Sequence, residues 1–274
     1  MHVICSVPQG SVLGPRLFIM YSADLADKAV ERDINFHGYA DDIQLYVHCR
    51  PEEIAATTPK LEGCITDMDS WMSANRLKLN MDKTELLWAG TRYNTSMLND
   101  SGTSLQLNNV TVNASQHVRV LGVHLSSDLS LDKHVSSVSA TCFYHLRQLR
   151  GIRRSPDADS ATTLVHAFVT SRVDYCDAIL AAALKTTTDR LQRVLNAAAR
   201  VVSDTMKFDQ GLSRLMHQEL HWLDIPERVN YKLGVLTHAP VSARQGVSVP
   251  IKLLHSRQSS RYTAAFYALL HVIS

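Results

Sequence analysis

Two adjacent carboxylates, Asp41 and Asp42, are the side chains of this sequence best suited to do chemistry. They stand between two short runs of β type, 34–40 and 43–47, at the bend of an expected hairpin. Carboxylates this close repel each other, so they stay ionised together at low cost only in water or on a divalent cation. The pair alone leaves two interpretations open, a solvated turn and a metal site at a hairpin tip.

The segments around this pair predict the elements that would hold it. The second run buries one face through Ile43, Leu45 and Val47 and turns its polar residues to the other. Helices are expected over 13–30 and about 51–75. The apolar stripe of the first helix consists of Leu17, Met20, Tyr21 and Leu25. The stripe of the second consists of Leu61, Ile65, Met68 and Met72.

Further along the chain, strands are expected at 86–88 and 118–125, and Gly122 marks a bulge or a close backbone approach in the latter. Residues 91–116, rich in Asn, Ser, Thr and Gly, predict a surface loop or a loose hairpin at 105–112. From residue 131 the pattern is helical. The expected helices cover about 132–150, 158–171, 189–203, 210–220 and 227–238.

These elements predict an α+β fold followed by a mostly α-helical region. We expect an α+β domain over 1–125 and a helical region over 126–239. Residues 240–274 carry no assignment beyond a candidate terminal helix in their alanine-rich end.

Composition narrows the class of protein. The chain has 274 residues, of which 45% are hydrophobic and 20% charged, as in a soluble globular protein. No apolar run approaches the roughly 20 residues of a membrane span, and no secretory signal opens the sequence. The five cysteines are scattered without a CxxC pair, which predicts reduced thiols in an intracellular, nuclear or cytoplasmic protein that is not secreted.

Charge is distributed unevenly along the chain. Residues 1–125 hold 10 Lys and Arg against 14 Asp and Glu, a net charge of −4, and residues 126–274 hold 18 against 12, a net charge of +6. An acidic half followed by a basic helical half suits a nucleic-acid enzyme, although ordinary surface variation would also produce it. Arg190, Arg193 and Arg200 share one helical face, which is either solvated or in contact with phosphates.

Two histidines four residues apart, His217 and His221, do not form a metal motif. The zinc-protease signature needs a glutamate directly after the first histidine, and here Glu219 stands two positions after it. We therefore expect these histidines to belong to an ordinary packed or surface helix.

Four blocks in order carry a resemblance to a known family. They are VPQGSVLGP at 7–15, YADD at 39–42, WMSANRLKLNMDKTELLWAG at 71–90 and VRVLGVHLSSDLS at 118–130. In this order they resemble the reverse transcriptases of LINE-type (non-LTR) retrotransposons, of the jockey-like kind, most densely over 7–130. The stretch LHWLDIPERVNYKL at 220–233 resembles a block that follows the polymerase in related proteins. The resemblance implies a truncated palm, with the YADD hairpin packed against helices, and a thumb-like helical region.

The resemblance also implies roles for individual residues. Asp41 and Asp42 match the metal-ligating pair, with Mg²⁺ as cofactor and Mn²⁺ as an alternative ion. Lys83 matches a lysine proposed to protonate the leaving pyrophosphate. The template and incoming nucleotide would meet Pro8, Gln9, Gly10 and Tyr39, and the primer would meet Leu121 and Gly122. The implied partners are an RNA template, a DNA primer and deoxynucleoside triphosphates, with no membrane and no known protein partner.

One expected part of the site is not found in the sequence. The family places a third carboxylate on a strand before the VPQG block, and residues 1–6 contain no acid. We therefore expect this chain to polymerise poorly by itself. Two alternatives stay open, a non-catalytic nucleic-acid-binding remnant and a decayed element whose product barely folds.

Overall fold

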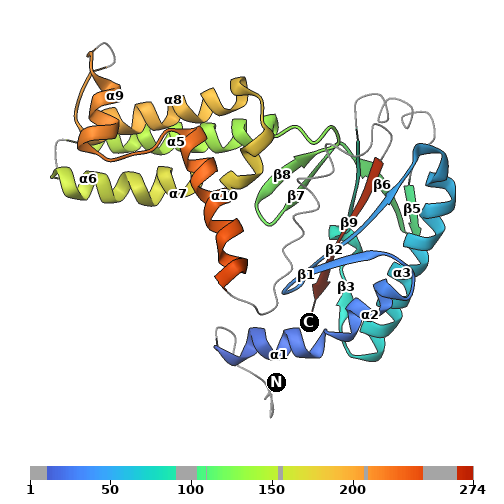
Figure 1. Ribbon diagram of the computed structural model, residues 1–274. Coiled ribbons are helices and arrows are strands. Elements are labelled where there is room, and N and C mark those ends of the chain that lie inside the picture. The colour runs from blue at the N-terminus through green and yellow to red at the C-terminus, as the bar shows by residue number, and fades with distance from the viewer. Residues whose placement is uncertain are drawn as a thin grey trace. The chain divides into compact units, whose positions relative to one another are not determined.

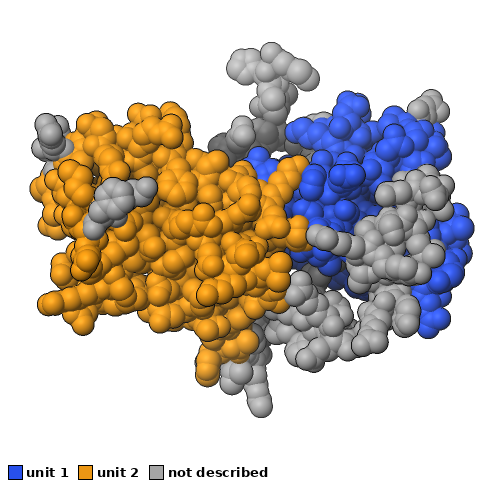
Figure 2. Space-filling view, turned by 90° about the horizontal axis from the view of Figure 1, so that it is seen from above, with its two compact units in different colours: residues 1–129, 254–274 blue, residues 130–253 orange. Residues whose placement is uncertain are grey.

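The computed structural model describes residues 11–90, 104–108, 110–153, 157–206, 209–242 and 264–273. The chain divides into two compact units, one of residues 1–129 with 254–274 and one of residues 130–253 (Figure 2). Strands concentrate in the first unit and helices in the second, which confirms a mixed α and β composition. The C-terminal segment belongs to the first unit, although it follows the second in the sequence.

The first unit is built on a β-sheet. In the described part of the chain this sheet has seven strands, in the order β1-β2-β9-β4-β6-β5, and β3 also pairs with β9 (Figure 1). The strands are β1 (Asn35–Tyr39), β2 (Asp42–Cys49), β3 (Lys78–Leu79), β4 (Glu85–Ala89), β5 (Ser104–Leu107), β6 (Val110–Ser115) and β9 (Ala264–Ile273). Neighbouring strands are antiparallel except for β4 and β6, which are parallel.

Strand β9 corrects the expectation of a terminal helix. It pairs with β2 from Asp42↔His271 to Cys49↔Ala264, and on its other side with β4 from Glu85↔Leu269 to Ala89↔Ala265. Alanine content favoured a helix in this apolar run, but an apolar run of this kind also suits a strand paired on both sides. The backbone groups of β2 and β4 need partners, and β9 supplies them to both strands.

Helix α3 (Ile54–Ala74), preceded by the short η1 (Pro51–Glu53), covers one face of the sheet (Figure 1). Its predicted stripe is confirmed, since Leu61, Ile65, Met68 and Met72 are fully buried. They form one core with Leu45 of β2 and with Leu86 and Trp88 of β4. Helix α2 (Asp24–Val30) joins this core through Leu25 and Ala29.

The helix predicted over 13–30 is two helices, α1 (Leu13–Tyr21) and α2, and most of its stripe is exposed. Ser22 is the C-terminal cap of α1, where both its backbone N–H and its hydroxyl donate to the carbonyl of Phe18. The break changes the face that each helix presents. Leu17, Met20 and Tyr21 are 45%, 74% and 48% exposed, whereas Leu25 in α2 is 1% exposed. The prediction of a continuous buried stripe was therefore wrong for α1.

The hairpin predicted at 105–112 is present as β5 and β6, but it is not a loose surface feature. Leu105, Leu107 and Val112 are buried in the core beneath α3. Strand β6 also extends the sheet by pairing with β4. The polar composition of the surrounding segment concealed this short apolar alternation.

The second unit consists of helices close to the predicted ones. They are α5 (Asp132–Ile152), α6 (Ala158–Val165), η3 (His166–Thr170), α7 (Ser171–Val173), η4 (Asp177–Ala182), α8 (Lys185–Val202), α9 (Leu212–Arg214), η5 (Leu215–Glu219) and α10 (Ile225–Ser242). Only η4 was not anticipated. The core is formed chiefly by α8, whose Val194, Leu195 and Ala198 are fully buried, with α5 and α6 packed around it. None of the described helices combines the length and the apolar character that a membrane crossing requires.

Asp177, at the start of η4, is a buried carboxyl with an unfavourable environment. It is 6% exposed, and its Oδ1 finds no hydrogen-bond partner among the described residues. Burial raises the pKa of Asp177, and the nearby charge of Asp174 raises it further. The protonated form is thus favoured in the folded state, so this group's contribution to stability falls as pH rises through its folded-state pKa.

We expect Asp177→Asn to stabilise the second unit at neutral pH. Removing a desolvated charge should raise the free energy of unfolding by about 1 kcal/mol at pH 7, and the gain should shrink as the pH falls through the raised pKa of the native carboxyl and that carboxyl takes up a proton. Urea titrations at several pH values measure this. Asp174→Asn is the control, because Asp174 accepts two hydrogen bonds from Arg228, at 2.8 and 2.9 Å, and its loss should destabilise. A pH-independent difference for Asp177→Asn would contradict the assignment.

Candidate functional site

The carboxylate pair lies at the tip of the β1–β2 hairpin, as predicted, with one shift in register. Tyr39 pairs with Asp42, so the connection consists of Ala40 and Asp41, and Asp42 is the first residue of β2. Positive φ falls on Ala40, at 53°, and on neither aspartate. The left-handed position of this turn is therefore occupied by an alanine and by neither aspartate. A two-residue hairpin places a positive φ on its first position in some turn types, and here this position is an alanine.

The hairpin tip is held by a strand that is paired on both sides. Ile43 and Leu45 are 3% and 0% exposed, which confirms the predicted buried face of β2. Strand β1 pairs along one edge of β2 and β9 along the other. The side chain of Asp41 is exposed and that of Asp42 is partly buried. The backbone that carries the carboxylates is thus positioned by the core, while Asp41 faces solvent.

Lys83 lies at the same end of the sheet as the carboxylates. Asp42 pairs with His271 near the end of β9, and Glu85, the first residue of β4, pairs with Leu269. Lys83 is exposed and ends the short helix η2 (Met81–Lys83), two residues before β4 begins. Strands β2 and β4 flank β9, so their backbones are about 10 Å apart. The register of these strands therefore brings the acidic tip and the lysine to the same end of the sheet.

The electrostatics of the tip suit a hard cation with oxygen ligands. Among the described residues, no lysine or arginine forms an ion pair with Asp41. Two neighbouring carboxylates can supply a Mg²⁺ ion with oxygen ligands while water completes its shell. No group of three or more His, Cys, Asp or Glu side chains in the described ranges is arranged to hold a metal ion. At the tip itself the described residues thus offer two adjacent carboxylates as candidate ligands.

Of the four residues predicted to contact the template and the incoming nucleotide, the structure describes only Tyr39. Pro8, Gln9 and Gly10 lie outside the described residues, so their predicted position across a cleft from Asp41 stays a prediction. Tyr39 is 63% exposed at the end of β1, opposite Asp42 in the ladder. Its ring is therefore available to a ligand that approaches the hairpin tip.

The predicted primer-contact residues, Leu121 and Gly122, form a turn. The strand expected over 118–125 is a hairpin of β7 (His117–Val120) and β8 (Val123–Ser126), and Gly122 lies in its turn and not in a bulge. Both turn residues have positive φ, 45° for Leu121 and 85° for Gly122, which is the pattern that reverses a chain within two residues. Val118 packs on Leu87 and Ala89, on the face of β4 opposite Leu86 and Trp88.

We expect Gly122→Ala to destabilise the β7–β8 hairpin. A side chain at a φ of 85° is strained, and the free energy of unfolding of the first unit should fall by about 1–2 kcal/mol. Gly151→Ala is the matched control, because Gly151 lies in α5 with open space around the added Cβ. That change should raise the stability of the second unit by about 0.5–1 kcal/mol. Chemical denaturation followed by circular dichroism measures both, and equal effects would contradict the turn geometry.

The predicted arginine face of α8 is largely engaged within the protein. Arg190 donates to Ser136 and lies 3.7 Å from an oxygen of Asp132. Arg193 and Arg200 each donate to a backbone carbonyl one helical turn earlier. These contacts weaken the interpretation of this face as a ready phosphate-binding surface.

The histidine pair His217 and His221 forms no metal site in the described residues. Nδ1 of His217 lies 3.0 Å from the carbonyl of Trp222, and Nε2 lies 3.5 Å from Asp224. His221 is exposed and has a positive φ of 53° just after η5. The expectation of an ordinary helical setting is confirmed for His217.

Sequence reasoning missed the neighbour of the carboxylates, strand β9, and an exposed aromatic cluster on α5 and η3. The signal for β9 was a continuous apolar run of strand length near the C-terminus, which pattern alone cannot distinguish from a helix. The cluster left no periodic signal, because its rings come from two segments far apart in the sequence.

Comparison with known proteins identifies relatives of this chain. Residues 2–125 match the family described as reverse transcriptase (RNA-dependent DNA polymerase). The chain is 26% identical over 232 residues to the probable RNA-directed DNA polymerase from transposon BS of Drosophila melanogaster, covering 82% of this chain and 25% of that protein. It is 24% identical over 143 residues to the RNA-directed DNA polymerase from mobile element jockey of the same species, covering 50% of this chain and 14% of that protein.

A third relative is the probable RNA-directed DNA polymerase from transposon X-element of Drosophila melanogaster, 22% identical over 238 residues, covering 84% of this chain and 25% of that protein. The chain thus spans a quarter or less of the length of these relatives. No solved structure matches it.

Proposed function

Residues 2–125 belong to the reverse transcriptase family, of the LINE-type (non-LTR) retrotransposon kind, and from this premise we propose that the chain takes part in RNA-directed DNA polymerisation. In this proposal the first unit is a palm, with the β1–β2 hairpin as its catalytic element, and the second unit is thumb-like. The partners are an RNA template, a DNA primer and deoxynucleoside triphosphates. The protein acts inside the cell.

Asp41 and Asp42 would hold Mg²⁺, or Mn²⁺ in its place. In a two-metal site the ions lower the pKa of the attacking 3′-hydroxyl and neutralise the charge of the triphosphate. The two carboxylates would supply oxygen ligands to an ion of this kind from a hairpin tip whose second strand is paired on both sides. The Nζ of Lys83 carries a positive charge to the same edge of the sheet, where it would donate a proton to the leaving pyrophosphate.

The remaining roles concern the nucleic acid. Tyr39, beside the carboxylates in the ladder, would contact the incoming nucleotide together with Pro8, Gln9 and Gly10. The turn at Leu121 and Gly122 would contact the primer strand. Its strands pack on β4, the strand that follows Lys83, and this shared support favours a common site.

One observation carries the proposal. The carboxylate pair and Lys83 come from separate sequence blocks, and the register of β2, β9 and β4 brings both to one end of the sheet. A solvated turn would need no lysine from η2 at that end of the sheet.

The alternative function is nucleic-acid binding without catalysis. The described residues include no third acidic side chain grouped with Asp41 and Asp42. A second metal ion would then lack a ligand from this chain. The net charge of +6 over residues 126–274 is compatible with binding to phosphates in either case.

Primer extension separates the two functions. The purified chain is supplied with a labelled DNA primer on an RNA template, deoxynucleotides and Mg²⁺, and the Asp41→Asn variant is assayed beside it. Extension that requires Mg²⁺ and Asp41 supports polymerisation. Salt-sensitive binding of the hybrid with no extension above the Asp41→Asn variant supports the alternative.

A further inference from the structure

The second unit carries three aromatic rings in successive contact, of which Tyr144 and Phe168 are exposed and His145 is partly buried. Tyr144 and His145 of α5 have ring centroids 5.4 Å apart at an interplanar angle of 74°. His145 stacks on Phe168 of η3, with centroids 5.2 Å apart and an angle of 26°. Tyr144 is 57% exposed and Phe168 is 41% exposed. We call these three residues the ring cluster.

The helices beneath the ring cluster are firmly packed, so the rings are held in place. Cys142 is fully buried, and its thiol contacts the carbonyl of Val169 across the two segments. Burial raises the pKa of this thiol to about 11, which keeps it neutral. Val165 and Val169 are also fully buried in the same core. The segments that carry the rings are therefore anchored by an inward apolar face.

The surface around the ring cluster is free of acidic residues. Neither 134–153 nor 160–173 contains an Asp or Glu, although both segments are largely solvent-facing helix. Three exposed arginines occur in them, Arg147, Arg150 and Arg172. Arg147 lies three residues after Tyr144 on α5, and Arg172 lies four residues after Phe168.

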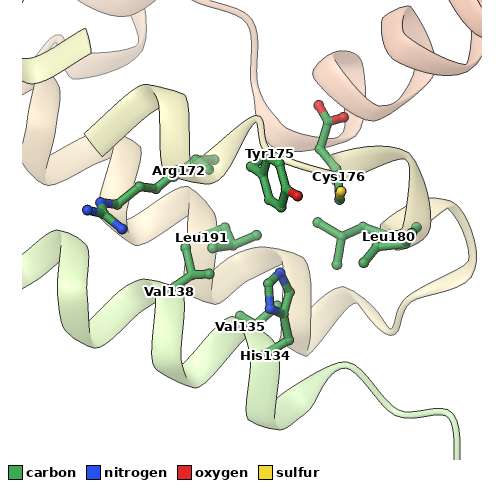
Figure 3. A pocket seen from close by; sticks show the side chains of 11 residues that line it. His134, Val135, Val138, Arg172, Tyr175, Cys176, Leu180 and Leu191 are labelled. Carbon is green, nitrogen blue, oxygen red and sulfur yellow. The ribbon is translucent and has the colours of Figure 1, made fainter. Parts of the chain in front are cut away.

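These three arginines differ from those of α8. Among the described residues, Arg147, Arg150 and Arg172 form no ion pair with a carboxylate, whereas Arg190 faces Asp132. Arg172 and Val138 are among the residues that line a cavity of about 10 Å³ (Figure 3). That cavity holds at most one water molecule. The side chains of Arg147, Arg150 and Arg172 are all exposed, so they are accessible to a polyanion.

We propose that the ring cluster and its arginines bind single-stranded nucleic acid by stacking unpaired bases. Exposed rings offer faces on which bases of any sequence stack, and neighbouring arginines neutralise the phosphates between them. A duplex conceals its base faces and would gain only the phosphate contacts. The proposal rests on the proposed function for the kind of polymer, and it adds the surface that would hold an unpaired template or product strand.

Fluorescence anisotropy of the full chain with a labelled oligouridine of about twelve nucleotides tests this proposal. Tyr144→Ala and Phe168→Ala are each expected to raise Kd by about 5- to 150-fold, the range that loss of one stacked base produces. Tyr144→Phe keeps the ring and should bind as the native chain does. Arg147→Ala should lower the slope of log Kd against log salt concentration by about 1.

The controls lie on two other helices of the same unit, α10 and α8. Tyr231 of α10 is 67% exposed, so Tyr231→Ala removes an equally accessible ring, and it should leave Kd unchanged. Arg193→Ala removes an arginine that bonds to its own helix. All the substituted side chains are exposed, and circular dichroism checks that each variant is folded.

The outcomes decide between the alternatives. Oligouridine and oligothymidine should both bind at least about tenfold more tightly than a duplex of the same length. A difference in Kd between these two oligonucleotides would indicate selectivity for the sugar. Equal binding of duplex, or an equal effect of Tyr231→Ala, would overturn the proposal. Concentration-dependent dimerisation that Tyr144→Ala abolishes, without any effect on oligouridine binding, would show that a second copy of the chain covers the rings. Failure of the proposed function appears separately, as primer extension that does not depend on Asp41.

Discussion

The chain of 274 residues is expected to extend a primer at least about a thousandfold more slowly than the same chain preceded by the corresponding upstream segment of a relative. The expected difference in rate arises from the number of carboxylate ligands that the chain offers to metal ions. Asp41 and Asp42 are adjacent on one hairpin, and two neighbouring carboxylates hold one Mg²⁺ weakly without bridging two ions at catalytic spacing. Losing one ion removes either activation of the attacking hydroxyl or stabilisation of the leaving group.

Steady-state extension on an RNA template measures both proteins, and Asp41→Asn should abolish the activity of the longer one. Glu52→Gln is the matched control, because Glu52 is exposed and follows β2 at the end opposite Asp42, roughly 25 Å along the strand. It neutralises an acid of the same unit and should leave the rate unchanged. Comparable rates from the short and long chains would show that another carboxylate, such as Asp24, Asp27 or Asp33, completes the site.

Leu269→Pro is expected to disrupt the sheet of the first unit. Leu269 lies in the middle of β9 and pairs with Gln44 on one side and Glu85 on the other. Proline removes a ladder N–H and cannot fit a strand that is paired on both sides, so the free energy of unfolding of this unit should fall by about 3 kcal/mol or more. The exposed edges of β2 and β4 should also promote aggregation.

Amide hydrogen exchange followed by mass spectrometry measures this effect. Peptides from β2 and β4 should lose protection in Leu269→Pro, while peptides from α8 in the second unit serve as an internal reference. Ala158→Pro is the control, because residue 158 is the first of α6, directly after the capping Asp157, where proline is tolerated. Unchanged protection in β2 and β4 would mean that β9 is not their neighbour. In the native structure β9 pairs with β2 along the whole length of β2, from Asp42 to Cys49.

Much of this protein follows from local pattern. The buried stripe of α3, from Leu61 to Met72, is complete within one helix, so periodicity alone was sufficient to find it. The same holds for the helices of the second unit and for the hairpin around Asp41. The family followed from four short blocks, because their residues and order are specific even where their structure is not. These features depend on residues a few positions apart.

Other features depend on residues far apart, and only the tertiary structure decided them. The exposure of α1 followed from what lies beside it, since Leu17 and Leu25 have the same apolar character. An apolar run at 264–273 suits a helix or a strand equally well, and it became β9 because β2 and β4 both offered unpaired backbone groups. Likewise His145 meets Phe168, and the carboxylate pair shares a sheet edge with Lys83, only through pairing and packing across the chain. Sequence therefore determined the local elements and the chemistry they carry. Long-range hydrogen bonding and burial determined which of them lie together, because those energies depend on neighbours that no local pattern contains.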